Sequence, residues 1–327
     1  MAHVAIIGSG VWGTAFGAHL ASIGLDVKIW SRSQADLLES SRKHPLLKSK
    51  LPENIKFYDK VEPVVTGAKE IICMIPSSTF VDFLNMIKPY YEPEQIVLWG
   101  CKGWVKHTDS IYFNEVAEQI LGKVPMAALS GPTFAEELAE GKPTAIVIAS
   151  SEQTTAEDVM ARFHGGSLRC YCSLAMNTVQ FCGVYKNIIA VAAGISDGLA
   201  LGANARSALI TRGIAEMFRA AKAMGLETEA IMGLAGLGDV MLSATSDLSR
   251  NRKLGLALGQ GLALTEVIKQ PGMSTLESTK NVAMMLEIAK DSSIELPIAA
   301  GVYQVISGEA KISEIVENLL KRQPTYE

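Results

Sequence analysis

Apolar and polar positions follow two different patterns along the chain. Up to about residue 175, short apolar runs alternate with helical patterns, which is typical of β-α-β units around a parallel sheet. The predicted strands are 3–7, 27–30, 70–76, 96–99, 125–130, 144–149 and 168–172. The polar, proline-containing stretch 33–69 is predicted as helix, loop and short connections. Beyond residue 175 strand signals fade and helical periodicity continues, so the pattern predicts an α/β domain over 1–178 and an all-α domain over 179–327.

The helical half opens with an apolar segment, 179–194, which is predicted as a buried helix with one ionisable side chain, Lys186. At helical spacing, Gly183, Ala190 and Ala193 share the face of Lys186. Small residues around an ammonium leave room for another molecule. The alternative is a lysine whose stem lies on apolar surface while its ammonium reaches water.

A G-x-G-x-x-G motif follows the first predicted strand and precedes a predicted helix, which is the context that a dinucleotide-binding turn requires. Gly8 allows the tight turn, Gly10 lets the backbone approach a pyrophosphate, and Gly13 lets helix and strand pack closely. The free N–H groups and the dipole at the start of the helix attract the phosphates. The motif therefore predicts a nucleotide cofactor.

The end of the second predicted strand departs from the pattern of NAD sites. An acidic residue that binds the ribose is expected there, about 20 residues after the motif. The sequence has Arg32 instead. An arginine can pair with a 2′-phosphate, which favours NADP(H), while a solvated arginine at the start of a loop is the alternative.

Polar side chains follow two further strands and should face the cofactor crevice, because ligands of parallel sheets gather at the carboxyl ends of strands. They are Ser77 and Ser78 after one strand and Lys102 after the next. A solvated loop lysine is the alternative for Lys102. Further along, Thr133 and Glu136 are spaced as a capping box at the start of a helix.

A basic segment in the second half is predicted to begin a helix with Ser249 as its N-cap. Arg250, Arg252 and Lys253 then lie in the first helical turn, where cations oppose the helix dipole. An anion bound at this helix start would offset the unfavourable interaction of these cations with the dipole. Arg250 would then bind a phosphate through two guanidinium N–H groups, and Asn251 would donate a hydrogen bond to it. A solvated basic turn is the competing interpretation.

Composition narrows the function classes. The chain has 327 residues, 48% of them hydrophobic and 20% charged, which is typical of a soluble globular protein of two domains. A net charge of −4 argues against nucleic acid as a partner. No apolar run reaches the ~18 residues of a membrane span, and no signal peptide is recognised. The 5 cysteines lack a C-x-x-C pair and the 5 histidines lack metal-ligand spacing, so we expect no metal site and a reducing cytoplasm.

Taken together, these segments resemble the bacterial-type NAD(P)-dependent sn-glycerol-3-phosphate dehydrogenase family over essentially the whole chain. The resemblance rests on the motifs at 8–15, 101–103, 129–137, 183–195, 212–213, 233–239 and 249–251. It implies a Rossmann-type domain followed by an all-α domain like the C-terminal domain of 6-phosphogluconate dehydrogenase. It also implies that NADPH or NADH reduces dihydroxyacetone phosphate reversibly to sn-glycerol 3-phosphate, which feeds phospholipid synthesis, and that the enzyme is a cytoplasmic homodimer.

The resemblance also implies residue roles, with Lys186 as the catalytic proton donor and acceptor. Implied substrate contacts are Lys102, Gly131, Thr133, Lys186, Asp239, Ser249, Arg250 and Asn251. Implied cofactor contacts are Gly8, Ser9, Gly10, Trp12, Gly13, Arg32, Lys102, Ala135, Arg250 and Glu277. Two places depart from the family pattern: Gly183-Val-Tyr185 stands for the usual Gly-Ala-Leu, and Glu277-Ser278 for the usual Glu-Gly.

Two other functions fit parts of the pattern. A dehydrogenase of the same layout that acts on a hydroxyacid would share the lysine on its helix, but the Ser249–Asn251 segment and Asp239 favour a phosphoester. A module that senses NAD(P)H without chemistry would leave Lys186, Asp239 and Arg250 unexplained.

Overall fold

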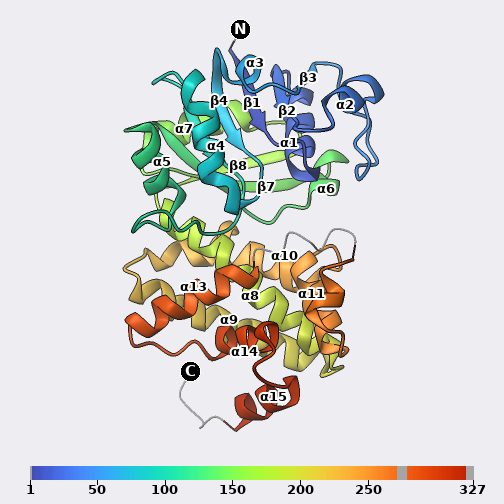
Figure 1. The fold of residues 1–327 in the computed structure, drawn as a ribbon, viewed down its shortest axis with the longest axis vertical. Helices are drawn as coiled ribbons and strands as arrows, with labels where there is room; N and C mark the ends of the chain where they lie inside the picture. The colour runs from blue at the N-terminus through green and yellow to red at the C-terminus, as the bar shows by residue number, and fades with distance from the viewer. Residues whose placement is uncertain (1, 271–277, 322–327) are drawn as a thin grey trace. The chain divides into compact units, whose positions relative to one another are not determined.

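The computed structural model describes residues 2–270 and 278–321. The chain forms two compact units (Figure 1). Unit 1 contains the residues up to Gln180 together with Gly233–Ala235, and unit 2 contains Phe181–Met232 and the residues from Gly236 onward. The chain passes from unit 1 into unit 2 within one long helix, α8 (Met176–Gly198).

Unit 1 is built on an eight-stranded sheet with the order β3-β2-β1-β4-β5-β6-β7-β8. Its strands are β1 (His3–Ile7), β2 (Val27–Trp30), β3 (Ile55–Tyr58), β4 (Ala68–Cys73), β5 (Ile96–Trp99), β6 (Met126–Ser130), β7 (Thr144–Ala149) and β8 (Leu168–Ser173). Neighbouring strands pair in parallel, except for β6 and β7, which are antiparallel. The predicted α/β domain is confirmed. The prediction for 33–69 was incomplete, because it missed the short edge strand β3, where buried Ile55 and Phe57 alternate with exposed Lys56.

Helices cover both faces of this sheet, because its inner strands are apolar on both sides. Along β1, Val4 and Ile6 belong to one hydrophobic core and Ala5 and Ile7 to the other. The helices of unit 1 are α1 (Val11–Ser22), α2 (Ala35–Ser41), α3 (Glu62–Val65), α4 (Phe80–Ile87), α5 (Phe113–Leu121), α6 (Ala135–Ala139) and α7 (Gln153–Phe163). Residues of α1 and α7 pack in the first core, and residues of α4 and α5 in the second.

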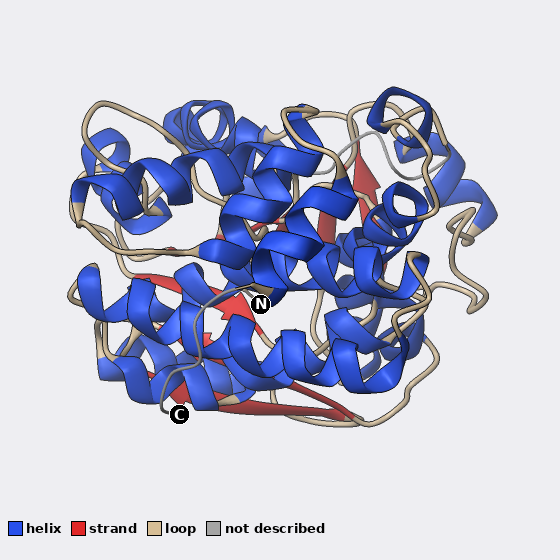
Figure 2. Cartoon of the chain, turned by 90° about the horizontal axis from the view of Figure 1, so that it is seen from below, coloured by secondary structure: helices blue, strands red, loops and turns tan. Residues whose placement is uncertain are grey.

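Unit 2 is helical wherever the structure describes regular elements, because the described strands, β1 to β8, all belong to unit 1; Figure 2 colours helices blue and strands red. Besides α8 it contains α9 (Gly202–Ala223), α10 (Asp239–Thr245), α11 (Arg250–Gly259), α12 (Leu264–Val267), α13 (Ser278–Asp291), α14 (Pro297–Ser307) and α15 (Ile312–Leu320). A 3₁₀ turn, η3 (Thr228–Met232), and a π-helical turn, η4 (Leu234–Gly238), lead into α10. The prediction of an all-α second half is confirmed.

Helix α8 corrects one expectation from composition. By length and composition alone, its 23 residues could cross a membrane, and this holds for no other helix in the described ranges. The most apolar stretch of α8 is completely buried inside the protein, as in the core helix of a globular domain.

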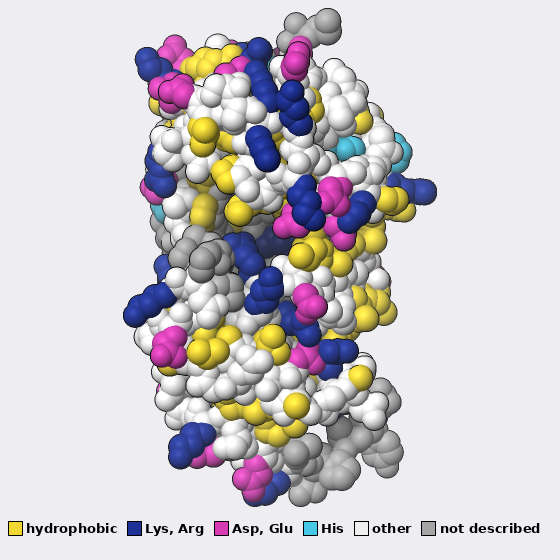
Figure 3. All heavy atoms as spheres, turned by 90° about the vertical axis from the view of Figure 1, so that its right-hand side faces the viewer, with side chains coloured by type: hydrophobic (Ala, Val, Ile, Leu, Met, Phe, Trp, Pro, Cys, Tyr) yellow, Lys and Arg dark blue, Asp and Glu magenta, His cyan; other side chains and the backbone are white. Residues whose placement is uncertain are grey.

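Acidic side chains lie beside basic ones in several places on the face shown in Figure 3.

Candidate active site

The glycine-rich turn of unit 1 joins β1 to α1, and two of its glycines are required by space. Gly8 has a φ of +121°, and a Cβ there would lie 2.6 Å from the carbonyl oxygen of Met74. A Cβ on Gly13 would lie 2.2 Å from the carbonyl oxygen of Gly8. A Cβ on Gly10, the residue before α1, would meet no atom within 4 Å, so the backbone there is open to an approaching group. This arrangement fits a cradle for a pyrophosphate at a helix N-terminus.

The end of β2 is tied to the same turn by hydroxyl groups. Ser9 Oγ donates to Ser31 Oγ over 2.6 Å, and Thr14 Oγ1 donates to the carbonyl oxygen of Ser9 over 3.1 Å. Arg32 follows as an exposed residue. Trp12 stacks on the ring of Phe16 in the first two turns of α1, with ring centroids 5.1 Å apart. Because Arg32 follows Ser31, which is hydrogen-bonded to Ser9 of the glycine turn, the backbone of Arg32 lies near that turn in space.

A second group of predicted residues meets where β5 and β6 end. Lys102 Nζ donates to the carbonyl oxygen of Gly131 over 3.3 Å. Gly131 has a φ of +131°, and a Cβ there would lie 2.9 Å from the carbonyl oxygen of Ala145, so glycine is required. The hydroxyls of Ser130 and Thr133 are buried and have no hydrogen-bond partner among the described residues.

The predicted capping box of Thr133 and Glu136 was wrong. Helix α6 begins at Ala135, its N-cap is Phe134, and no side chain caps it. Phe134 is extended, with φ −100° and ψ 136°, so the chain enters the helix too late for the Thr133 hydroxyl to reach the first turn. The hydroxyl of Thr133 thus has no structural partner in the helix that the sequence assigned to it.

The central cluster of unit 2 is built around Lys186 on α8. Its Nζ donates to Asp239 Oδ1 over 2.7 Å and to Ser243 Oγ over 3.0 Å. Both charges are buried, with 9% of Lys186 and 1% of Asp239 exposed. The ammonium is therefore held inside unit 2 by a carboxylate and a hydroxyl, and the alternative of a lysine reaching water does not describe it.

The glycine-rich segment before α10 brings Asp239 to this position. It folds as the π-helical turn η4, and a Cβ on Gly236 would lie 2.0 Å from the carbonyl oxygen of Ile231. Asp239 then becomes the first residue of α10, and Ser243 lies one helical turn further on the same face. The turn places carboxylate and hydroxyl together toward Lys186.

The start of α11 confirms the predicted N-cap and decides against one alternative. Ser249 is the N-cap, because its Oγ accepts from the backbone N–H of Arg252 over 3.3 Å. Arg250 is exposed, whereas Arg252 is buried, so the alternative of a solvated basic turn does not describe Arg252. Asn251 Nδ2 donates to Asn187 Oδ1 over 2.9 Å, and Asn251 Oδ1 is buried without a partner in the described chain. Because Asn187 follows Lys186 in α8, this bond links the start of α11 to the lysine.

Sequence reasoning missed two side chains of this cluster, Ser243 and Asn187. The spacing of Ser243 from Asp239 and the adjacency of Asn187 to Lys186 are signals, but neither identifies the partner. Glu277, a predicted cofactor contact, lies outside the described residues. No group of three or more His, Cys, Asp or Glu side chains within 2–270 and 278–321 is arranged to hold a metal ion.

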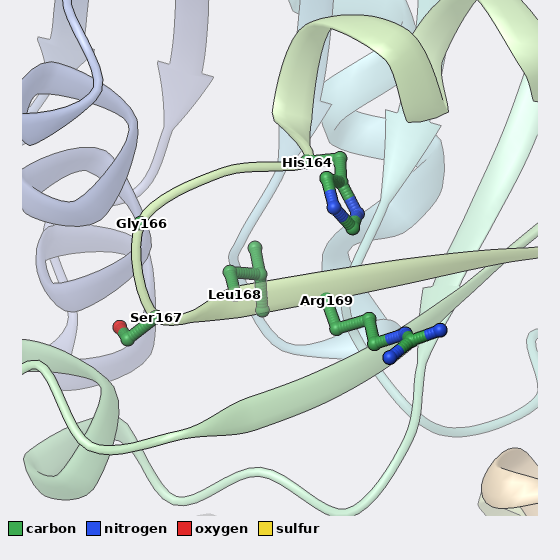
Figure 4. A pocket seen from close by; sticks show the side chains of 5 residues that line it. All are labelled: His164, Gly166, Ser167, Leu168 and Arg169. Carbon is green, nitrogen blue, oxygen red and sulfur yellow. The ribbon is translucent and has the colours of Figure 1, made fainter.

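A cavity of about 430 Å³ lies elsewhere in unit 1, at the loop between α7 and β8 (Figure 4). It is lined by His164, Gly166, Ser167, Leu168 and Arg169. The imidazole of His164 accepts from the backbone N–H of Cys170 over 3.1 Å, which is a structural role. None of the predicted site residues lines this cavity, so it adds nothing to the candidate site.

Comparison with known proteins covers both units. The model of the NAD-dependent glycerol-3-phosphate dehydrogenase N-terminus matches residues 3–156, and that of its C-terminus matches residues 176–317. Glycerol-3-phosphate dehydrogenase (NAD(P)+) of Halorhodospira halophila is 37% identical over 99% of this chain and 98% of its own length. That of Bartonella tribocorum is 40% identical over 97% and 96%. The crystal structure of glycerol-3-phosphate dehydrogenase from Coxiella burnetii superposes with a TM-score of 0.91, at 37% identity over 98% of this chain and 99% of that one.

Proposed function

Because the chain belongs to the NAD-dependent glycerol-3-phosphate dehydrogenase family, we propose that it reduces dihydroxyacetone phosphate reversibly to sn-glycerol 3-phosphate with NADPH or NADH. In this proposal residues 1–178 bind the cofactor and residues 179–327 carry the proton donor and the phosphate site. The product supplies glycerophospholipid synthesis in the cytoplasm. The observation that carries the proposal is the buried ammonium of Lys186, held by Asp239 and Ser243.

The glycine turn and the residues around it are the proposed cofactor site. The backbone from Gly8 to Gly10 and the start of α1 hold the pyrophosphate, and Arg32 pairs with a 2′-phosphate when NADPH binds. Trp12 and Ala135 stay proposed contacts of the same cofactor. When bound, the reduced nicotinamide supplies the hydride that the C2 carbonyl of the substrate needs.

The proposed role of Lys186 is proton transfer. As the C2 carbonyl oxygen gains negative charge, the ammonium donates a proton to it, and in the reverse direction the neutral amine takes the proton from the hydroxyl. Asp239 and Ser243 hold Nζ in a fixed direction through bonds of 2.7 and 3.0 Å. A donor that is oriented before the substrate arrives does not have to reorganise during the reaction.

The proposed phosphate site is the start of α11. Arg250 is an exposed cation there, and Ser249 and Asn251 flank it with polar groups. A guanidinium and a helix N-terminus both favour a phosphate dianion. Lys102, Gly131 and Thr133 stay proposed substrate contacts from unit 1.

The test is a steady-state assay that follows the absorbance of the reduced nicotinamide. We expect turnover with dihydroxyacetone phosphate, formation of the sn-3 phosphate ester, and much lower turnover with keto acids. Preference for keto acids would support the hydroxyacid alternative, and cofactor binding without turnover on any ketone would support the sensing module. Arg32→Ala should raise the KM for NADPH more than that for NADH, since only NADPH carries the 2′-phosphate.

Oligomeric state is a separate part of the proposal. Family resemblance supports a homodimer, and light scattering coupled to size-exclusion chromatography measures the mass directly. A mass near the 35.1 kDa of one chain at assay concentration would remove the homodimer from the proposal.

A further inference from the structure

The first turn of α11 is held against α8 by a buried arginine, Arg252. Arg252 Nε and Nη2 donate to Asp197 Oδ2 over 3.0 and 2.6 Å, and Nη1 donates to Asp247 Oδ1 over 2.5 Å. The side chains of Asp197 and Arg252 are 11% and 10% exposed, whereas Asp247 is 93% exposed. The bond to Asp197 is therefore the shielded one and the bond to Asp247 is peripheral.

A close helix crossing accompanies this ion pair. A Cβ on Gly194 of α8 would lie 2.1 Å from the carbonyl oxygen of Arg252, and a Cβ on Gly255 of α11 would lie 2.0 Å from that of Val191. One turn further, Gly198 and Gly259 show the same relation to the opposite helix. The two backbones are therefore in direct contact, so their spacing is fixed at the point where Arg252 reaches Asp197.

Fixing Arg252 also decides where its two predecessors lie. Successive residues of a helix project about 100° apart. With Arg252 directed onto α8, Arg250 is exposed and Asn251 reaches Asn187, the neighbour of Lys186. The orientation of the start of α11 thus links a buried ion pair to the residues of the proposed phosphate site.

From this geometry we infer that Asp197 and Arg252 are positioning residues for substrate, which hold Arg250 and Asn251 at a fixed distance from Lys186. The inference rests on the proposed function, because it assigns these two residues to the same phosphate site. Neither residue touches the reacting atoms. Their effect is on how the phosphate is held, and through it on where the carbonyl carbon lies relative to the proton donor.

The ionic character of the pair supports a fixed geometry. Burial alone would lower the pKa of Arg252, but its hydrogen bonds to Asp197 and Asp247 raise that pKa above its ordinary value. Asp197 Oδ1 also accepts from Arg206 Nη1 over 2.9 Å, so both of its oxygens are engaged by guanidinium groups. A lysine at position 252 would keep the charge but lose the planar fork.

The test compares Asp197→Asn, Arg252→Lys and Arg252→Gln with the parent protein, and uses Arg206→Gln as the matched control. Arg206 contacts the other oxygen of Asp197 and is 31% exposed, so its loss leaves the bond to Arg252 intact. We expect the KM for dihydroxyacetone phosphate to rise about ten- to hundredfold in Asp197→Asn and Arg252→Gln, and less in Arg252→Lys. The KM for NADPH should stay within about twofold, and Arg206→Gln should behave as the parent.

Two results overturn the inference. One is an unchanged KM for dihydroxyacetone phosphate in all three variants at a temperature where each is folded. The other is a rise of similar size in the KM for dihydroxyacetone phosphate and in the KM for NADPH, together with a fall in thermal stability. A purely structural ion pair would give that result. The double variant Asp197→Asn/Arg252→Gln should be no worse than the worse single variant, because both remove one interaction.

Calorimetric binding of sn-glycerol 3-phosphate provides the same comparison without turnover. If the parent protein binds this ester but does not turn over dihydroxyacetone phosphate, the proposed reaction fails while the variants still test positioning through their affinity. If the parent neither binds the ester nor reduces the ketone, both the proposed function and the inference fall.

Discussion

Replacing Lys186 by Met removes the proposed proton donor and, at the same time, takes the ammonium away from a buried carboxylate, Asp239. Asp239 is 1% exposed, and in the parent protein its Oδ1 accepts from Lys186 Nζ over 2.7 Å. After the substitution, the hydroxyl of Ser243, 3.3 Å from that oxygen, is a remaining donor. The variant therefore changes stability and chemistry together, and the two effects have to be separated.

The stability effect follows from the burial of the pair. Breaking a buried ion pair by removing one partner costs about 3–5 kcal/mol. For a unit of this size, 1 kcal/mol shifts the melting temperature by about 2–4 °C, so Lys186→Met should melt about 6–20 °C below the parent. Adding Asp239→Asn to Lys186→Met removes the buried negative charge that the ammonium had balanced. The double variant should therefore recover most of the lost melting temperature.

The chemical effect should behave differently. Loss of a positioned general acid lowers the rate of proton transfer by about 10²–10⁴. Because the double variant Lys186→Met/Asp239→Asn still lacks the donor, its kcat should stay as low as that of Lys186→Met even though its stability recovers. The glycine turn belongs to unit 1, so both variants should still bind NADPH.

The assay measures thermal unfolding, NADPH binding by fluorescence and the kcat for dihydroxyacetone phosphate on the same preparations. Lys222→Met, an exposed lysine on α9, is the matched control and should change none of them. A double variant that recovers stability and also turns over at the parent rate would refute the role of Lys186. A Lys186→Met variant as stable as the parent would refute the reasoning about the buried pair.

Three further predictions test other parts of the structure. Arg250→Ala should raise the KM for dihydroxyacetone phosphate about ten- to hundredfold by removing a charge-assisted bond to phosphate, while Lys253→Ala, an exposed neighbour, should not. Burial raises the pKa of Glu216 above its ordinary value of 4.5, so its contribution to stability is present below that value and is lost as pH rises through the raised pKa. Glu216→Gln should remove this component, at most about 1.4 kcal/mol per pH unit, from the pH dependence of chemical denaturation. Gly194→Ala should cost about 1–3 kcal/mol by pushing α8 from α11, and Gly213→Ala less, because its Cβ would lie 2.9 Å from the Ile189 side chain and not against backbone at 2.1 Å; equal melting temperatures would contradict this reasoning.

Local pattern was sufficient for most of the fold, because most elements obey one hydrophobic period. Seven of the eight strands, α1 after the glycine turn and the helical second half were predicted in this way. The wrong predictions lie where the sequence signal for an element was weak, or where the same signal is compatible with two local structures. Strand β3 has only four residues in a polar stretch, and the Thr133–Glu136 spacing satisfies a capping box that the extended backbone at Phe134 does not form.

The candidate site was predictable by residue type but not by partner. The family resemblance named Lys186, Asp239 and Asn251 together as residues of the substrate site. That Lys186 and Asp239 form a buried ion pair, and that Asn251 bonds Asn187, depends on contacts between residues 53 and 64 positions apart. No periodicity spans such distances, so the geometry of the site had to come from the folded chain.

Tyr185 shows what a departure from a family pattern can mean physically. A leucine, which the resemblance noted above would imply at this position, could serve as packing alone. Here the Tyr185 hydroxyl donates to Glu216 over 2.8 Å, and the same carboxylate accepts the backbone N–H groups of Ile298 and Ala299 at the start of α14. Because burial and the Glu216 carboxylate raise the pKa of Tyr185, the hydroxyl keeps its proton and remains a donor. Tyr185 precedes Lys186 on α8, so a bond that fixes the tyrosine also restricts rotation of α8 about its axis, and with it the direction in which the lysine points.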